Sequence, residues 1–283
     1  TAIDHGINFF DTANRYSFGQ SEQILGNAIS GRDTDELVIG TKVYWNMTDD
    51  PNSGGLSRKT ITQELAASRE RLGIDTVDLY QIHAWDDDTP IRQTLRALDD
   101  AVARGHVHSV GTCSIKAIQL ARSLETSRAS SLVSFDTLQN HYCLVHREDE
   151  RELLPLADER GLGVIPWSPL ARGFLARPFD EIEATERGSS GNYIQSHKER
   201  YIRAGGKIIN ERVQELATQM DVSMAQISLA WLLHKDIVDT PIVGVSSVEH
   251  LLEAVEATEI SLSESELSYL EAPYEPIMPI PER

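Results

Sequence analysis

The chain has 283 residues, of which 40% are hydrophobic and 25% are charged, and its formal net charge is -18 at pH 7. This composition is typical of a soluble globular protein, and no apolar run reaches the roughly 18 residues that a membrane-spanning helix needs. The acidic balance disfavours nucleic acid as a partner, because binding to phosphates depends on clustered Lys and Arg. The first residues lack a signal-peptide pattern, so we expect a cytoplasmic protein with neither membrane nor nucleic-acid partners.

Lysine is scarce in this chain. Only 6 of the 26 basic residues are Lys and the other 20 are Arg, against 44 acidic residues. Two hypotheses fit this bias, a halophilic protein adapted to a high-salt cytoplasm and a protein that is merely acidic. The two cysteines, Cys113 and Cys143, have no paired spacing, which argues against a disulfide framework or a zinc site.

Strand and helix patterns alternate along the chain. Short apolar stretches predict seven buried strands, at 7–10, 37–39, 77–80, 107–110, 132–135, 162–165 and 241–245. Between them, apolar residues recur every three or four positions, as in 91–102, 209–216 and 248–255, which indicates helices. Thr89-Pro90 marks a helix start, and Gly73, Gly105 and Gly161 mark helix ends. This alternation predicts βαβ units and a parallel sheet.

Two architectures fit a parallel sheet, an open doubly wound sheet and a closed (β/α)8 TIM barrel. No Gly-x-Gly-x-x-Gly follows any predicted strand, although an open dinucleotide-binding sheet would show one. Polar or aromatic residues instead end nearly every strand: Asp11, Lys42, His83, Ser114, Gln139, Trp167 and Ser246. A ring of strands gathers such residues over one pocket, so we predict a single α/β barrel domain over 1–283.

The barrel prediction leaves one strand unaccounted for. Only seven strands are visible, and residues 1–6 resemble the last turn of a helix, so we expect that the first strand is missing from an N-terminally incomplete sequence. The segment 171–206, rich in charge, Gly and Ser, has weak periodicity, and we predict a lid or binding loop there.

Four residues on three consecutive strands form a candidate catalytic group. Tyr16 follows Asp11 by one short loop, and Lys42 and His83 end the next two strands. Each alone is more simply explained by packing or solvation. Together they are complementary, because an ammonium lowers the pKa of a tyrosine, which is about 10 when free. A buried Lys42 needs a counter-ion such as Asp11, and a neutral His83 could orient a carbonyl oxygen.

The chain resembles the aldo-keto reductase superfamily over essentially its whole length. The matching blocks are 6–13, 21–26, 41–42, 82–83, 139–142, 166–173 and 241–244. They are most similar to microbial aryl-alcohol dehydrogenase-like members. The resemblance implies NAD(P)H-dependent reduction of aldehydes or ketones by a tetrad of Asp11, Tyr16, Lys42 and His83. Tyr16 would protonate the carbonyl oxygen while NADPH delivers a hydride to its carbon.

The resemblance also implies which residues hold the cofactor. Trp167 matches the aromatic residue that stacks on the nicotinamide, and Ser114 and Gln139 match the partners of its carboxamide. The remaining matches are Ser168, Leu170 and Gly173 in a pyrophosphate loop, and Gly244, Ser246, His250 and Glu253 near the adenosine. Ser246 stands where the family often has Lys or Arg for a 2′-phosphate. NADPH is therefore the expected cofactor, and NADH is the alternative.

The substrate pocket is expected to be lined by Tyr44, Trp45 and Trp85, with Tyr142 as a further candidate. Aromatic walls favour aromatic or medium-sized apolar carbonyl compounds. Two rival functions are a cofactor-binding regulatory subunit of the potassium-channel β-subunit type, with little turnover, and a protein without activity. An intact tetrad favours the enzyme over both.

Overall fold

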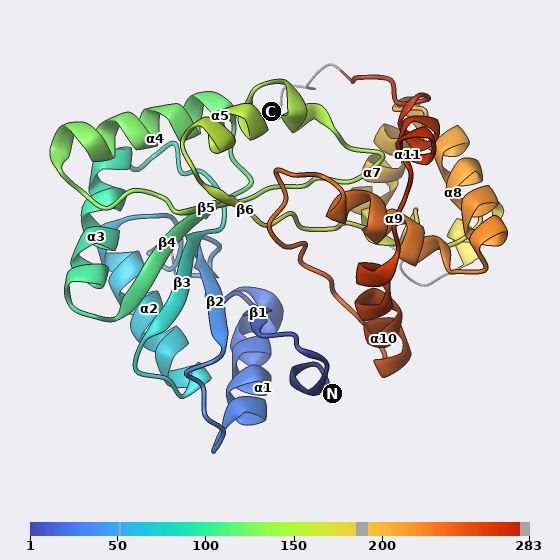
Figure 1. The fold of residues 1–283 in the computed structure, drawn as a ribbon. Helices are drawn as coiled ribbons and strands as arrows, with labels where there is room; N and C mark the ends of the chain where they lie inside the picture. The colour runs from blue at the N-terminus through green and yellow to red at the C-terminus, as the bar shows by residue number, and fades with distance from the viewer. Residues whose placement is uncertain (51, 185–191, 278–283) are drawn as a thin grey trace. The chain divides into compact units, whose positions relative to one another are not determined.

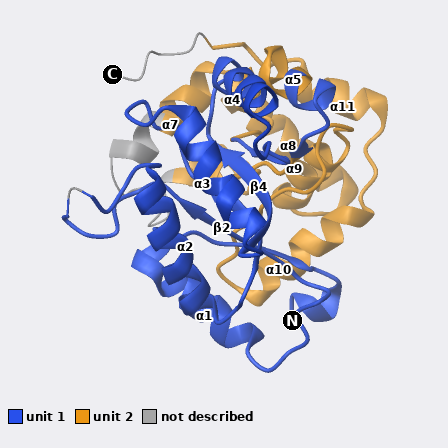
Figure 2. Ribbon diagram, turned by 90° about the vertical axis from the view of Figure 1, so that its left-hand side faces the viewer, with its two compact units in different colours: residues 1–140, 156–163 blue, residues 141–155, 164–283 orange. Residues whose placement is uncertain are grey.

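The computed structural model describes residues 1–50, 52–184 and 192–277 (Figure 1). The chain forms two compact units, coloured separately in Figure 2. Unit 1 comprises residues 1–140 and 156–163, and unit 2 comprises residues 141–155 and 164–283. Within the described ranges, no helix is long and apolar enough to cross a membrane.

Unit 1 is built on parallel strands that follow one another in chain order. They are β1 (Phe9–Asp11), β2 (Val38–Val43), β3 (Val77–Ile82), β4 (Val107–Cys113) and β5 (Thr137–Gln139). In the paired register, Asp11 lies opposite Gly40 and Lys42 lies opposite Gln81. β6 (Gly163–Val164), whose first residue ends unit 1, is the last strand of this six-stranded sheet. The predicted parallel α/β fold is confirmed, with six strands in the described part of the chain.

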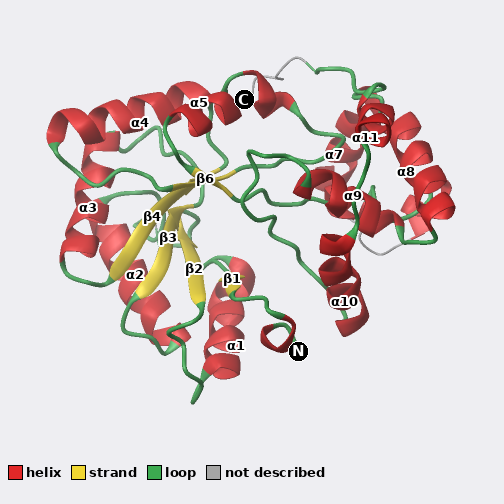
Figure 3. Cartoon of the chain, in the orientation of Figure 1, coloured by secondary structure: helices red, strands yellow, loops and turns green. Residues whose placement is uncertain are grey.

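Helices flank the strands of unit 1 and alternate with them along the chain (Figure 3). They are η1 (Ile3–His5), η2 (Tyr16–Gly19), α1 (Gln20–Ile29), α2 (Arg58–Leu72), α3 (Ile91–Ala103) and α4 (Ala117–Ser130). The predicted helix at 91–102 is α3, which buries Ile91, Leu95 and Leu98. It begins one residue later than Thr89-Pro90 suggested, because Pro90 is the N-cap. Because helices cover the strands, nearly every residue of β2 and β3 is buried.

The fifth strand lies further along the chain than its apolar pattern predicted. The stretch 132–135 is not a strand, and β5 begins at Thr137. The backbone of Val133 is bonded elsewhere, because its N–H donates to Asp99 (2.9 Å) and its carbonyl accepts from Ser127 Oγ (2.8 Å). Helix side chains thus replace the neighbouring strand as hydrogen-bond partners.

Unit 2 is mainly helical in its described residues. Its elements are η3 (Glu148–Arg151), the start of α5 (Leu153–Glu159), η4 (Ala171–Gly173), η5 (Phe179–Ala184), α7 (Asn192–Arg203), α8 (Gly206–Met220), α9 (Met224–Leu233), α10 (Val248–Glu256), η6 (Ala257–Glu259) and α11 (Glu264–Glu271). The helices predicted at 209–216 and 248–255 are α8 and α10. α8 packs against α7, α9 and α11.

The seventh predicted strand, 241–245, is wrong as a strand. Its extended backbone makes one isolated bridge, between Ile242 and Trp167, and the Ile242 N–H donates to the carbonyl of Pro166 (2.8 Å). Pro166 and Pro241 have no N–H to donate, which stops a continuous ladder from forming here.

The segment 171–206 contains more regular structure than its weak periodicity suggested. It includes η4, η5 and α7, while residues 185–191 lie outside the described part of the chain. Tyr201 on α7 is buried and packs edge-on against Phe174, with 5.5 Å between ring centroids. A buried tyrosine on a polar helix is too sparse a signal for apolar periodicity to detect. The lid role stays a prediction.

Both cysteines, Cys113 and Cys143, are free and buried.

Gly26 on α1 is a sensitive point of the unit 1 packing. A Cβ there would lie 2.6 Å from the carbonyl oxygen of Leu72 and 2.7 Å from that of Arg71, at the end of α2. We expect Gly26→Ala to lower the free energy of unfolding by about 1–3 kcal/mol, because backbone atoms must move. Urea unfolding measures this, with the exposed Asn27→Ala on the same helix as the control. Equal stability of the two variants would contradict the close packing of α1 on α2.

Candidate active site

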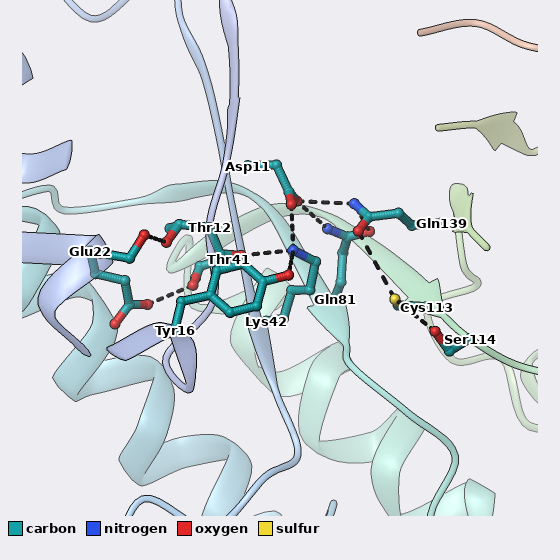
Figure 4. Close-up of polar contacts among 11 residues, drawn as sticks. Asp11, Thr12, Tyr16, Glu22, Thr41, Lys42, Gln81, Cys113, Ser114 and Gln139 are labelled. Atoms are coloured by element: carbon teal, nitrogen blue, oxygen red, sulfur yellow. Dashed lines mark hydrogen bonds and ion pairs between the residues drawn. The ribbon is translucent and has the colours of Figure 1, made fainter. Parts of the chain in front are cut away.

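Polar side chains gather where the strands of unit 1 end (Figure 4). Asp11 is the last residue of β1, Lys42 is the last but one of β2, and Gln139 is the last of β5. His83 directly follows β3, and Tyr16 opens the turn η2 after β1. Carboxyl ends of parallel strands meet at one edge of a sheet, so residues far apart in sequence come together here.

Lys42 lies at the centre of this group and is fully buried. Its ammonium donates to Asp11 Oδ2, to the carbonyl oxygen of Thr12 (2.9 Å) and to Tyr16 Oη (3.4 Å). Burial alone would lower the pKa of Lys42, but the nearby Asp11 and Tyr16 outweigh burial and raise it above its ordinary value. Lys42 therefore stays charged at neutral pH.

Tyr16 approaches Lys42 from a tight turn. Tyr16 is 41% exposed as a whole residue, and the Lys42 ammonium lies 5.0 Å from its ring centroid. Burial around the hydroxyl raises the pKa of Tyr16, Lys42 lowers it, and the net direction is upward. The predicted effect of Lys42 on the pKa of Tyr16 has the right sign, but burial has the larger effect. Tyr16 thus keeps its proton at neutral pH, which suits a proton donor.

His83 is the second polar ring beside Tyr16. The two rings meet edge to face, with 5.5 Å between their centroids. Burial, aided by the charge of Lys42, lowers the pKa of His83 to about 3, so its imidazole is neutral. Its buried Nδ1 has no hydrogen-bond partner among the described residues. A neutral ring beside a protonated tyrosine can donate a hydrogen bond to a carbonyl oxygen.

Gln81 joins the site although the sequence analysis did not select it. Its Nε2 and that of Gln139 each donate to Asp11 Oδ1 at 3.0 Å, and Gln139 Nε2 also lies 3.4 Å from Gln81 Oε1. The available signal was a polar residue inside the apolar strand β3, where a side chain must find a buried partner. The two amides satisfy the carboxylate oxygen that Lys42 does not reach.

Ser114 and Cys113 adjoin Gln139 in Figure 4. Ser114 has a positive φ of 53°, and its Oγ lies 3.3 Å from Cys113 Sγ. Cys113 Sγ is also 4.0 Å from Gln139 Oε1. Burial raises the pKa of Cys113 to about 11, so the thiol remains protonated and unreactive at neutral pH.

One of the predicted pocket aromatics, Trp45, lies beside His83, and Tyr44 lies beside Trp45. The Trp45 ring is 6.4 Å from that of His83 and 4.9 Å from that of Tyr44, between centroids, and both pairs are edge to face. Trp85 bonds through Nε1 to Asp87 (2.8 Å). Tyr142, the further candidate, is buried in unit 2, and its hydroxyl donates to Glu150.

Unit 2 carries the other predicted cofactor residues. Trp167 stacks on His141 with 4.4 Å between ring centroids, and His141 stacks in turn on His146 at 4.3 Å. The Arg172 guanidinium lies 5.7 Å from the Trp167 ring centroid. This ring stack, which the sequence analysis did not foresee, fixes the plane of the indole. The nearby Ser168, Leu170 and Gly173 lie at or just before η4.

The predicted adenosine end lies around the start of α10. Ser246 Oγ is 3.2 Å from His250 Nδ1, and Ser247 caps the helix through the N–H of His250. Gly244 precedes this pair, and Glu253 lies one helical turn after His250. The structure therefore brings Ser246 and His250 together at a helix N-terminus, where anions bind well.

Over nearly its whole length, this chain is similar to a family of reductases. The model of the aldo/keto reductase family matches residues 1–275. "Putative aryl-alcohol dehydrogenase C977.14c" of Schizosaccharomyces pombe is 38% identical, with 98% of this chain and 84% of the relative covered. The chain therefore belongs to the aldo/keto reductase family, and it is an oxidoreductase.

Two further relatives carry reductase names. An aldo-keto reductase of Alternaria alternata is 36% identical, with 96% of this chain and 80% of the relative covered. Versiconal hemiacetal acetate reductase of Aspergillus parasiticus is 35% identical, with 97% of this chain and 85% of the relative covered. These names and the family assignment support carbonyl reduction and do not favour a purely regulatory role.

The neutral His83 makes the protein sensitive to acid. The pKa of His83 is about 3 in the folded protein and about 6.5 in an unfolded chain, so between these values the unfolded chain binds one more proton. The stability that this difference contributes is complete above pH 6.5 and is lost as the pH falls toward 3. As the pH decreases from 6.5 toward 3, the unfolding free energy of the unaltered protein decreases. We expect this decrease to be smaller in His83→Asn, by about 1.4 kcal/mol per pH unit.

Urea unfolding at several pH values between 4 and 7 tests this, with His5→Asn at an exposed position as the matched control. The same pH dependence in His83→Asn and in the unaltered protein would show that His83 is not held neutral.

Proposed function

We propose that the chain is an NADPH-dependent reductase of aldehydes or ketones in which Tyr16 donates the proton. The observation that carries this proposal is the position of Tyr16 Oη, 3.4 Å from the buried Lys42 ammonium and beside the neutral ring of His83. The family assignment and the six parallel strands also support an eight-stranded (β/α)8 barrel as the complete fold.

The roles follow from the charges of the four residues. Asp11 holds Lys42 charged, and Lys42 stabilises the negative charge that develops on Tyr16 Oη as its proton leaves. The hydroxyl of Tyr16 and a ring N–H of His83 both donate toward the substrate oxygen. The carbonyl oxygen is thereby oriented and then protonated, so that the product leaves as an alcohol.

The residues around Gln139 fit the carboxamide of a nicotinamide. Gln139 gives its Nε2 to Asp11, so its Oε1 remains as an acceptor, and the Ser114 hydroxyl remains as a donor. A carboxamide needs one acceptor and one donor of this kind. When bound, the cofactor supplies the hydride that adds to the carbonyl carbon. In unit 2, the exposed Ser246 and His250 at the start of α10 support binding of a phosphate group, and hence NADPH over NADH.

The aromatic rings near His83 support an aromatic or medium-sized apolar carbonyl substrate. Trp45 is 47% exposed and lies next to His83 and Tyr44, so it offers an apolar face for a flat ring.

Tyr16→Phe tests the proton donor directly. We expect kcat for the NADPH-dependent reduction of an aryl aldehyde to fall by about 10³-fold, because the ring remains and the acidic proton is lost. The Kd for NADPH should stay within about two-fold of its original value, since no cofactor contact is assigned to this hydroxyl. Tyr80→Phe is the matched control, because it removes a buried hydroxyl that has no hydrogen-bond partner in the described part of the chain. Undiminished turnover in Tyr16→Phe would refute the mechanism.

Lys42→Met tests the electrostatic role of the ammonium. In the alcohol oxidation direction Tyr16 must lose its proton, so the rate should rise with pH through the pKa of Tyr16. Without Lys42 this pKa increases, and we expect the rise to shift to higher pH and kcat at pH 8 to fall by about 10- to 100-fold.

Lys59→Met, at an exposed position, is the control, and Lys42→Met/Asp11→Asn avoids a buried unpaired carboxylate. An unshifted pH profile in both Lys42 variants would exclude coupling between Lys42 and Tyr16.

A further inference from the structure

Two side chains at the start of α1 form hydrogen bonds with residues that adjoin Asp11 and Lys42 in the sequence. Ser21 Oγ lies 2.8 Å from Thr12 Oγ1, one residue after Asp11. Thr41 Oγ1 donates to Glu22 Oε1 at 2.5 Å, one residue before Lys42. The contact between Thr41 and Glu22 appears in Figure 4 beside Tyr16 and Lys42.

Glu22 is a fully buried carboxylate that takes no part in the proposed chemistry. Its second oxygen accepts from Arg71 Nε on α2 at 2.6 Å, and the Arg71 side chain is 18% exposed. Burying a charge is unfavourable unless every lone pair is well paired, and an apolar pair often serves stability as well. A role beyond stability is therefore worth seeking for Glu22.

The turn that carries Tyr16 needs support from outside. Ser17, Phe18 and Gly19 have positive φ values of 48°, 52° and 89°, in the region that non-glycine residues disfavour. Phe18 is 61% exposed, so packing does little to hold the turn. Such a backbone persists only where the surrounding structure determines it. The turn runs directly into α1, whose second and third residues are the bonded Ser21 and Glu22.

Arg71 also fills the space behind the turn. A Cβ on Gly19 would lie 2.7 Å from Arg71 Cδ, so the turn approaches Arg71 as closely as a glycine allows. Arg71 is itself fixed by Glu22 and by a contact from its Nη2 to Ser68 Oγ at 3.2 Å. The carboxylate of Glu22 thus joins three segments, the Tyr16 turn with α1, the end of β2 and α2.

We propose that Glu22, acting with Ser21 and Thr41, is a positioning residue that holds the hydroxyl of Tyr16 against Lys42. This inference rests on the proposed function of Tyr16. Glu22 does not touch the reacting atoms. It fixes the segment that carries Tyr16 to the segment that carries Lys42, which keeps the two polar atoms within 3.4 Å.

Thr41→Val is the mildest test, because it removes one hydrogen bond to Glu22 and leaves the Glu22–Arg71 pair in place. We expect kcat for aldehyde reduction to fall by about ten-fold or more, since small misplacements of reacting groups reduce rates strongly. The Kd for NADPH, from quenching of protein fluorescence, should change by less than about two-fold. Thr41→Ser keeps the hydroxyl and should restore kcat.

Thr94→Val is the matched control, because Thr94 is a buried threonine of unit 1 whose hydroxyl donates to the carbonyl of Leu56 at 3.2 Å. It should lower Tm without changing kcat. Ser21→Ala removes the other contact of α1 and should lower kcat in the same way as Thr41→Val. Because Glu22→Gln leaves Arg71 short of a counter-charge and could fold poorly, the two milder variants decide the question.

Normal kcat in both Thr41→Val and Ser21→Ala would overturn the positioning role. A fall in kcat that Thr41→Ser does not reverse, or that Thr94→Val reproduces, would equally overturn it, because a general loss of packing would then explain the result. The proposed function fails separately, if Tyr16→Phe itself retains full activity.

Discussion

The buried ammonium of Lys42 is the constraint on which the rest of the site depends. Burying a charge away from solvent is strongly unfavourable, and removing one partner of a buried ion pair typically lowers the free energy of unfolding by about 3–5 kcal/mol. Asp11 forms an ion pair with the ammonium, and Gln81 and Gln139 donate hydrogen bonds to the remaining oxygen of Asp11. Residues from β1, β2, β3 and β5 are therefore tied to one charge, so the sheet must form in this register before the site exists.

The same ammonium is one of two opposing influences on Tyr16. Burial raises the pKa of the phenol, and Lys42 lowers it by a smaller amount. The outcome is a phenol that stays protonated at rest and sits next to a positive charge that stabilises its anion. This combination suits a donor, which must hold its proton until the substrate takes it. His83, neutral because of its burial, adds a hydrogen-bond donor without adding another positive charge.

The sequence was sufficient for the parallel fold and for the residues that end its strands, because both depend on local patterns. Asp11, Lys42 and His83 each follow an apolar run, and short runs between helical patterns predict buried parallel strands. Gln81 could not be selected in this way, since its role depends on Asp11, which is 70 residues away in the chain. The shift of the fifth strand to Thr137–Gln139 likewise depends on distant side chains that take up the backbone of Val133.

The choice of lysine at position 42 has its own physical reason in an arginine-rich chain. Arginine outnumbers lysine by 20 to 6, and arginines make most of the ion pairs in the described part of the chain. An ammonium has three donors around one nitrogen, and Lys42 has three acceptors, in Asp11, Thr12 and Tyr16. A guanidinium would bring five donors in a rigid plane and leave some of them unpaired in a buried site. In the proposed mechanism all three protons of the ammonium are engaged, so Lys42 acts on Tyr16 through its charge, and the proton that reaches the substrate is the one on the tyrosine.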